Sequence, residues 1–177
     1  MRIEQLRREF DLQLRWTAFP LHPETPDEGL ELTELLAGRG YDLPAMFERV
    51  KGVAADLGLP WTTRSHTYNS RRAQELGKWA ENLGRGEAFH AAAYRAYFAE
   101  GSNIAQTEVL VALAETLGLD GSEARQVLVE RRFAAAVDAD WARARQLGIS
   151  AVPSALWKGE VLVGFQPYAA FRQLVSR

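Results

Sequence analysis

The spacing of hydrophobic residues changes near the beginning of the chain. Ile3, Leu6 and Phe10 recur at helical intervals, which predicts a helix over residues 2–9. From Asp11 to Phe19, hydrophobic and polar residues alternate, which is the period of a strand with one buried face. No N-cap residue precedes the helix, so we expect residues 2–9 to be the tail of a helix whose beginning is missing.

Most of the chain that follows has helical spacing. A proline-rich loop over residues 20–26 comes first, and nearly every segment from about Gly29 to Gly148 is predicted to be helical. The exception is an extended segment over residues 60–68. The expected helices cover residues 43–57, 70–83, 87–99, 107–117, 122–131 and 134–147. Glycines that follow several of these segments are typical of helix ends.

The end of the chain predicts a strand pair followed by a helix. Residues 149–166 contain a proline-marked strand entry, a tight turn at Lys158-Gly159 and a second strand, and a helix begins at about Pro167. One strand, many helices, two strands and a helix suit a small sheet that carries a helical insertion. We therefore expect an α/β fold, with residues 1–26 and 133–177 in one domain and an all-helical insertion over residues 27–132.

The composition argues against some classes of function. The 177 residues suit one domain, with or without an insertion, and 47% of them are hydrophobic. The formal net charge of -2 gives no electrostatic reason to expect a nucleic-acid partner. No apolar run reaches the length of a membrane span, and the first residues lack the apolar core of a signal peptide. We expect a cytoplasmic protein that binds neither nucleic acid nor membrane.

The chain contains no cysteine. Disulfides, thiolate metal ligands and thiol nucleophiles are therefore excluded for the chain as given. His22, His66 and His90 also show no spacing typical of a metal site. The paired arginines Arg71-Arg72 and Arg131-Arg132 have acidic neighbours, which predicts solvated faces.

Five motifs occur in one order over nearly the whole chain. They are LRWTAFPLHP at residues 14–23, YNSRRAQEL at residues 68–76, the helix from Phe89 to Gly101, ARARQLGISAVP at residues 142–153 and VGFQ at residues 163–166. Together they resemble the DsbA family of thioredoxin-fold oxidoreductases and, within it, the FrnE-like branch. The resemblance implies a thioredoxin-like fold with a large all-helical insertion, and thiol–disulfide exchange as the activity.

One part of the family pattern is missing. In the family, a first strand leads into a Cys-x-x-Cys motif at the start of the first helix, whereas this sequence begins inside what resembles that helix. Because exchange requires a thiolate, we expect the chain as given to be redox-inactive. The first hypothesis places the cysteines upstream of Met1. We also expect a gap between strand residues 12–17 and 154–157, where the resemblance places the first strand. The alternatives are a strand supplied by another chain and closure of these two strands into a smaller sheet.

The resemblance implies a set of substrate-binding residues. It implies a cis peptide bond between Val152 and Pro153, with the backbone of Val152 pairing with a substrate peptide. Similarity to kappa-class glutathione transferases and 2-hydroxychromene-2-carboxylate isomerases adds Asn69, Gln166 and His66 as possible contacts to bound thiol or substrate. Three of these positions have a structural alternative: a strand-entry proline at Pro153, an N-cap formed by Asn69 or by its neighbour, and a turn or helix-start residue at Gln166.

Two other functions stay open from the sequence. One is a cysteine-free module that binds a peptide or a small ligand without chemistry. The other is a glutathione-dependent transferase or isomerase of the kappa type, with glutathione as cofactor. In each case the expected partner is a peptide or small molecule, bearing a thiol or disulfide where the redox hypothesis applies.

Overall fold

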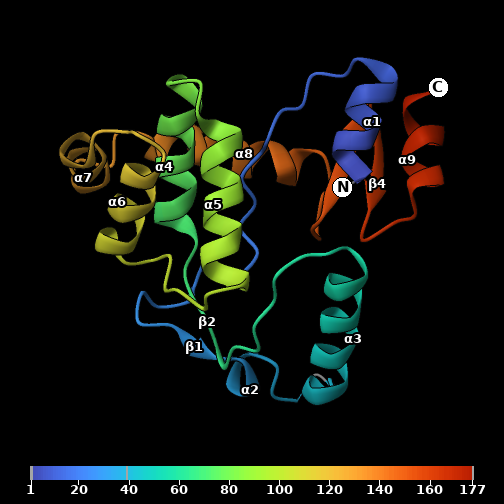
Figure 1. Cartoon of the computed structure of the whole chain (residues 1–177), viewed down its shortest axis with the longest axis horizontal. Coiled ribbons are helices and arrows are strands. Elements are labelled where there is room, and N and C mark those ends of the chain that lie inside the picture. The colour runs from blue at the N-terminus through green and yellow to red at the C-terminus, as the bar shows by residue number, and fades with distance from the viewer. Residues whose placement is uncertain (1, 39, 177) are drawn as a thin grey trace. The chain divides into compact units, whose positions relative to one another are not determined.

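The computed structural model describes residues 2–38 and 40–176 (Figure 1). Its backbone divides into two compact units, which we call unit 1 (residues 1–21 and 138–177) and unit 2 (residues 22–137). Each unit is described by itself. The division into a domain and an insertion stays a prediction, because compactness alone does not test it.

Unit 1 contains a hairpin and helices from both ends of the chain. Its elements are α1 (Arg2–Phe10), the end of α8 (Ala134–Gln146), β3 (Ser154–Trp157), β4 (Glu160–Val163) and α9 (Tyr168–Val175). β3 and β4 are antiparallel, with Ser154 opposite Val163. The predicted turn is confirmed, and both Lys158 (φ 47°) and Gly159 (φ 90°) have the positive φ angles of a tight hairpin turn.

The strand predicted for residues 11–19 is wrong. Residues 12–20 belong to no helix or strand, although their burial alternates: Leu12, Leu14 and Trp16 are half-buried and the residues between them are exposed. The alternation shows only that one side of the segment is buried. An extended segment can bury one side without a hydrogen-bonded neighbouring strand. Among the described residues, β3 pairs only with β4, so the expected absence of a ladder between residues 12–17 and β3 is confirmed.

Unit 2 is mostly helical, as the hydrophobic spacing predicts. Its elements are β1 (Leu30–Glu31), α2 (Leu32–Leu35), α3 (Leu43–Asp56), β2 (His66–Thr67), α4 (Arg71–Asn82), α5 (Gly86–Phe98), α6 (Thr107–Thr116), α7 (Gly121–Val129) and the beginning of α8. Gly84 and Gly118, at φ 70° and 75°, follow α4 and α6 in the left-handed conformation that ends helices.

A short strand pair corrects the prediction of a wholly helical segment from Gly29 onward. β1 pairs antiparallel with β2, with Leu30 opposite Thr67. Gly29 permits this approach because its φ is 98° and because a Cβ there would lie 2.6 Å from the Tyr68 ring. Residues 69–147 contain no strand, which confirms that part of the prediction.

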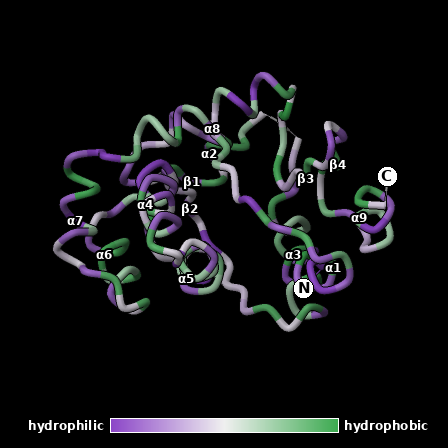
Figure 2. The backbone as a smooth tube through the Cα atoms, turned by 90° about the horizontal axis from the view of Figure 1, so that it is seen from above, coloured by the Kyte–Doolittle hydropathy of each residue, from purple (hydrophilic) through white to green (hydrophobic). Residues whose placement is uncertain are grey.

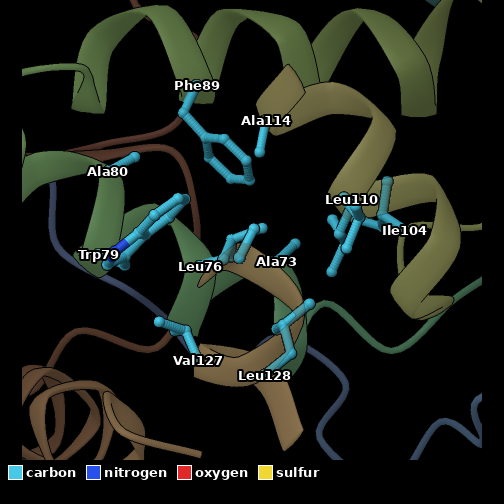
Figure 3. Packing of buried hydrophobic residues seen from close by; sticks show 12 residues of the cluster. Ala73, Leu76, Trp79, Ala80, Phe89, Ile104, Leu110, Ala114, Val127 and Leu128 are labelled. Carbon is cyan, nitrogen blue, oxygen red and sulfur yellow. The ribbon is translucent and has the colours of Figure 1, made fainter. Parts of the chain in front are cut away.

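The core of unit 2 is formed by the facing sides of α4, α5, α6 and α7. Leu76 and Leu110 are fully buried, and Phe89 is 1% exposed. Figure 3 shows these side chains pointing toward one another from three different helices. Figure 2 shows hydrophobic and hydrophilic stretches interleaved along the helices, as expected for one buried face each. Over residues 2–38 and 40–176, no helix is long and apolar enough to cross a membrane.

Candidate functional site

The Val152–Pro153 loop is tied to the end of the hairpin in unit 1. The peptide bond between these residues is cis. The Pro153 carbonyl oxygen accepts a hydrogen bond from the backbone N–H of Gly164 at 2.7 Å, and the Ser154 hydroxyl donates to the Ala151 carbonyl oxygen at 2.7 Å. The loop is therefore fixed on both sides of Val152.

The backbone N–H and C=O groups of Val152 form no hydrogen bond with the described residues. The Val152 side chain is among the exposed hydrophobic ones, at 42%. One donor and one acceptor of the same residue are thus available at the edge of the β3–β4 hairpin, which is the requirement for pairing with an extended peptide.

Gln166 closes the connection between β4 and α9. Its side-chain N–H donates to the Val163 carbonyl oxygen at 2.8 Å, and its backbone oxygen accepts from the Arg2 guanidinium at 2.8 Å. The guanidinium carbon of Arg2 lies 3.8 Å from the ring centre of Phe165, which is 59% exposed. The Gln166 side-chain oxygen accepts no hydrogen bond from a described residue, so one polar atom is left for a ligand.

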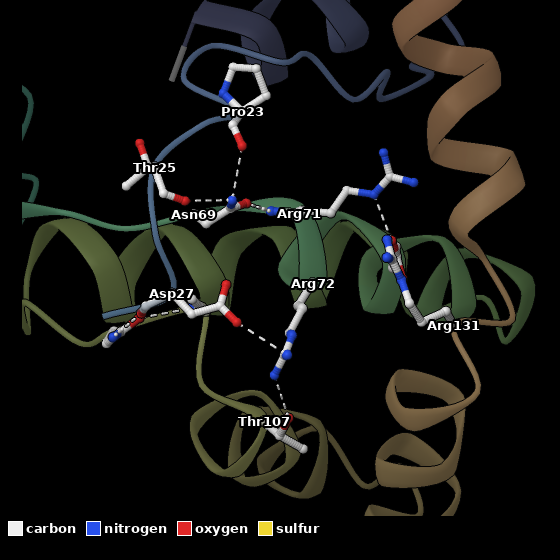
Figure 4. A network of polar contacts seen from close by, with 11 residues as sticks. Pro23, Thr25, Asp27, Asn69, Arg71, Arg72, Thr107 and Arg131 are labelled. Atoms are coloured by element: carbon white, nitrogen blue, oxygen red, sulfur yellow. Dashed lines mark hydrogen bonds and ion pairs between the residues drawn. The ribbon is translucent and has the colours of Figure 1, made fainter. Parts of the chain in front are cut away.

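Asn69 joins a loop to the beginning of α4 in unit 2 (Figure 4). Its side-chain NH2 group donates to the carbonyl oxygens of Pro23 at 3.1 Å and Thr25 at 2.7 Å. Its side-chain oxygen accepts from the backbone N–H of Arg71 at 2.9 Å. Ser70, at the N-cap position, makes no side-chain cap bond. All three polar contacts of Asn69 are therefore structural, and they favour its role as a helix cap over ligand contact.

His66 lies in β2 and is half-buried. Its Nδ1 is 2.8 Å from the Ser65 hydroxyl, and its ring stacks on Tyr68 with centroids 6.3 Å apart. Of the predicted site residues, His66 and Asn69 belong to unit 2, and Val152, Pro153 and Gln166 to unit 1. Within unit 1, the hydrogen bond from Gly164 to Pro153 holds the cis-proline loop beside the segment that carries Gln166.

A buried carboxylate corrects the prediction of solvated faces for Arg71, whereas Arg72, Arg131 and Arg132 are exposed as predicted. Glu75 of α4 is 1% exposed and forms ion pairs of 2.6 Å with both Arg71 and Arg131. Arg71 also donates to the Ala134 carbonyl oxygen at 2.9 Å. Burial by itself would raise the pKa of Glu75, but the hydrogen bonds and charges of Arg131 and Arg71 outweigh it and lower that pKa.

A second buried carboxylate was not predicted as a functional group from the sequence. Asp140 is 3% exposed and accepts a hydrogen bond from the backbone N–H of Ala18 at 2.9 Å, and Arg15 lies 3.6 Å from its other oxygen. Asp138, two residues earlier on α8, is exposed, as the helical spacing requires. Asp140 thus fixes the extended segment that follows α1, and only the burial of one face of α8 could have indicated it.

The candidate site residues offer hydrogen-bonding groups to a ligand. The sequence has no cysteine, and within residues 2–38 and 40–176 no group of three or more acidic, histidine or cysteine side chains is arranged to hold a metal ion. The Val152 backbone and the Gln166 side-chain oxygen can hold a peptide or small molecule through hydrogen bonds. No thiolate is present to attack a disulfide.

Known proteins of similar sequence and structure agree with this fold. A crystal structure of a probable DsbA oxidoreductase, SCO1869 from Streptomyces coelicolor, is similar with a TM-score of 0.89 and 31% identity, covering 99% of this chain and 80% of that one. The structure of a 2-hydroxychromene-2-carboxylate isomerase is similar with a TM-score of 0.68 and 20% identity, covering 99% and 84%. At that identity the second likeness shows the fold alone.

Sequence comparison gives a more distant relative and a family. The uncharacterized protein YwbO of Bacillus subtilis (strain 168) is 24% identical over 123 residues, which are 70% of this chain and 60% of YwbO, so the match spans less than two thirds of that relative. The model of the DSBA-like thioredoxin domain matches residues 1–176. The chain has a thioredoxin-like DsbA fold and belongs to the family of DSBA-like thioredoxin domains.

Proposed function

We propose that this chain serves thiol–disulfide exchange of the DsbA type, in the FrnE-like manner, by binding an extended thiol- or disulfide-bearing peptide at Val152. The observation that carries the proposal is the unused backbone N–H and C=O of Val152, next to the cis bond to Pro153. The likeness to a probable DsbA oxidoreductase at 31% identity supports the same class of activity.

The proposal assigns this chain the binding step and no redox step. A peptide that pairs with Val152 would lie along the loop with its side chains over exposed Val152 and Phe165. Because the sequence holds no cysteine, the chain as given would catalyse no reduction of insulin by dithiothreitol above background. Any catalysed rate would contradict this part of the proposal.

Peptide binding is tested by NMR of the isotope-labelled chain. The probe is reduced, carboxamidomethylated insulin B chain, which has extended segments and blocked thiols. We expect its addition to shift the Val152 amide resonance and to slow the exchange of that amide with solvent. Val152→Pro removes the N–H and should weaken binding, whereas Val152→Ala keeps it and serves as the matched control. Equal binding by the two folded variants would refute the proposal.

A glutathione-dependent isomerase is the second candidate. It is favoured by the free side-chain oxygen of Gln166 and by the shared fold of 2-hydroxychromene-2-carboxylate isomerase. Since a ligand that binds the native state stabilises it, glutathione should raise the melting temperature. The Gln166→Leu variant should lose that increase, and an increase of the same size in this variant would contradict a contact at Gln166.

A further inference from the structure

An arginine side chain in unit 2 is surrounded by aromatic rings. Arg64 lies in the extended segment before β2, and its guanidinium carbon is 4.5 Å from the ring centre of Tyr97, 4.9 Å from that of Phe98 and 5.8 Å from that of Trp61. Trp61 stacks on Phe98, and Phe98 stacks in turn on Tyr94. We call Arg64 and these four rings the aromatic cluster.

The segment that carries Arg64 is held against α5 by two hydrogen bonds. The backbone N–H of Thr62 donates to the Phe98 carbonyl oxygen at 2.9 Å, and the Thr67 hydroxyl and the Tyr97 hydroxyl lie 3.0 Å apart. One backbone and one side-chain hydrogen bond therefore join the two segments that form the aromatic cluster. Its geometry does not depend on unit 1, because every member belongs to unit 2.

Three donor atoms in the aromatic cluster are buried and lack a hydrogen-bond acceptor. They are Nε and Nη1 of Arg64 and Nε1 of Trp61, none of which has a partner among the described residues. The third guanidinium nitrogen, Nη2, is not buried and also bonds to no described residue. No acidic side chain of the described chain forms an ion pair with Arg64, so its charge is balanced only by the faces of the rings.

Such an arrangement favours an anionic ligand. Arginine stays charged at every relevant pH, and a buried donor without an acceptor costs about 1–3 kcal/mol. All three unsatisfied atoms donate, so the complementary group is one that only accepts, and a carboxylate matches the planar fork of a guanidinium with two parallel hydrogen bonds. Tyr94, which is 54% exposed, offers a flat aromatic surface beside the cluster.

We propose that the aromatic cluster binds the carboxylate of a small aromatic acid at Arg64. The carboxylate accepts a hydrogen bond from Nη2, the guanidinium nitrogen that is open to solvent, while the aromatic body of the ligand stacks on Tyr94. This binding site uses no thiol and lies in unit 2, so it is independent of the peptide site at Val152.

The experiment compares two probes of one shape. 1-Naphthoate carries the carboxylate, and 1-naphthamide is its neutral counterpart. In the wild-type chain, naphthoate should shift the Nε–Hε resonance of Arg64 and should bind at least about tenfold more tightly than naphthamide, as measured by NMR titration. Equal affinities, or an Arg64 resonance that neither probe shifts, would overturn the proposal.

Two variants test whether the binding of naphthoate depends on the positive charge of Arg64. Arg64→Met keeps a long apolar side chain and should lose the preference for naphthoate. Arg49→Met is the matched control, because Arg49 is exposed on α3 and bonds to no described residue, and it should bind naphthoate like the wild type. Unchanged naphthoate affinity in folded Arg64→Met refutes the site. If circular dichroism shows that this variant is unfolded, the two probes on the wild-type chain decide.

Discussion

Units 1 and 2 differ in what they bury and in what they leave open. Unit 2 has a continuous cluster of buried hydrophobic residues from α4 to α7 (Figure 3). In unit 1, the buried hydrophobic residues of the described chain are Leu6, Ala144 and Leu174. Both units expose large hydrophobic residues, but in unit 1 four of them fall in the hairpin and the adjoining loops, namely Val152, Val161, Val163 and Phe165.

The two units therefore differ in what stabilises them. A packed helical core stabilises unit 2, in which the short β1–β2 pair and a few single backbone hydrogen bonds join distant segments. Unit 1 has a two-stranded sheet, and such a hairpin is marginal unless helices or further strands cover it. The proposed peptide site is therefore in the unit with the smaller core, where exposed apolar surface and free backbone groups occur together.

The largest expected effect is on the free energy of unfolding, when a buried leucine is replaced by alanine in the core of each unit. Leu110 of α6 is fully buried and Leu174 of α9 is 8% exposed. Leu110→Ala should lower the free energy of unfolding by about 4 kcal/mol and Leu174→Ala by about 2 kcal/mol, measured by urea denaturation. Leu83→Ala is the control, because Leu83 is 49% exposed and its loss should cost less than about 0.5 kcal/mol. A larger effect at Leu174 would reverse the comparison.

The next effect tests the ion pairs of Glu75. Glu75→Gln keeps the size of the side chain and leaves Arg71, which is 16% exposed, without its charged partner. Because the uncompensated charge is mostly buried, we expect a loss of about 3 kcal/mol in the free energy of unfolding. Glu108→Gln is the control: its partner Arg125 and its own carboxylate are exposed, and an equal loss there would argue against burial as the cause.

The wild type and the Glu75→Gln variant should also differ in how their stability depends on pH. The pKa of Glu75 is lowered in the folded state from its ordinary value of 4.5, so the unfolded state binds the proton more readily. The stability that Glu75 contributes is therefore complete above that ordinary value and is lost as the pH falls through the folded-state pKa. The difference between the wild type and Glu75→Gln should shrink at acid pH, and a difference that grows there would contradict the assignment.

The smallest expected effect concerns Asn69. Asn69→Ala removes two hydrogen bonds to the loop and one to the beginning of α4, so the free energy of unfolding should fall by about 1–2 kcal/mol. Ser70→Ala is the matched neighbour and should cost less than Asn69→Ala, because the Ser70 hydroxyl makes no cap bond and accepts one hydrogen bond, from the Gln74 side chain at 3.0 Å. If Ser70→Ala costs more, then the cap is Ser70.

The sequence predicted the helices and the local β3–β4 hairpin well, and it predicted pairing between distant segments poorly. The helices of unit 2 follow from apolar spacing and terminal glycines, which are local properties. Residues 11–19 show that alternation identifies a one-sided extended segment but cannot identify a hydrogen-bonded neighbour. The pairing of Leu30 with Thr67 escaped prediction because strands of two residues carry no periodic signal.

For the site residues, too, the sequence could indicate local features but not contacts between distant segments. The resemblance identified the loop at Val152, but only three-dimensional contacts show that the backbone of Val152 is unused while Pro153 and Gly164 are joined. Arg71 and Glu75 stand four residues apart on one helix, so their pairing could have been predicted. The approach of Arg131 could not, since it comes from a segment far away in the sequence.

The loop at Val152 has a kinetic consequence. Since the Pro153 carbonyl oxygen is already bonded to Gly164, one residue can offer a bound peptide only two backbone hydrogen bonds. At about 0.5–1.5 kcal/mol each, they fall short of the roughly 4 kcal/mol that corresponds to a millimolar dissociation constant. A peptide bound as proposed, through these two hydrogen bonds alone, would therefore dissociate quickly. Such a short residence time would allow the same surface to bind peptides of many sequences one after another.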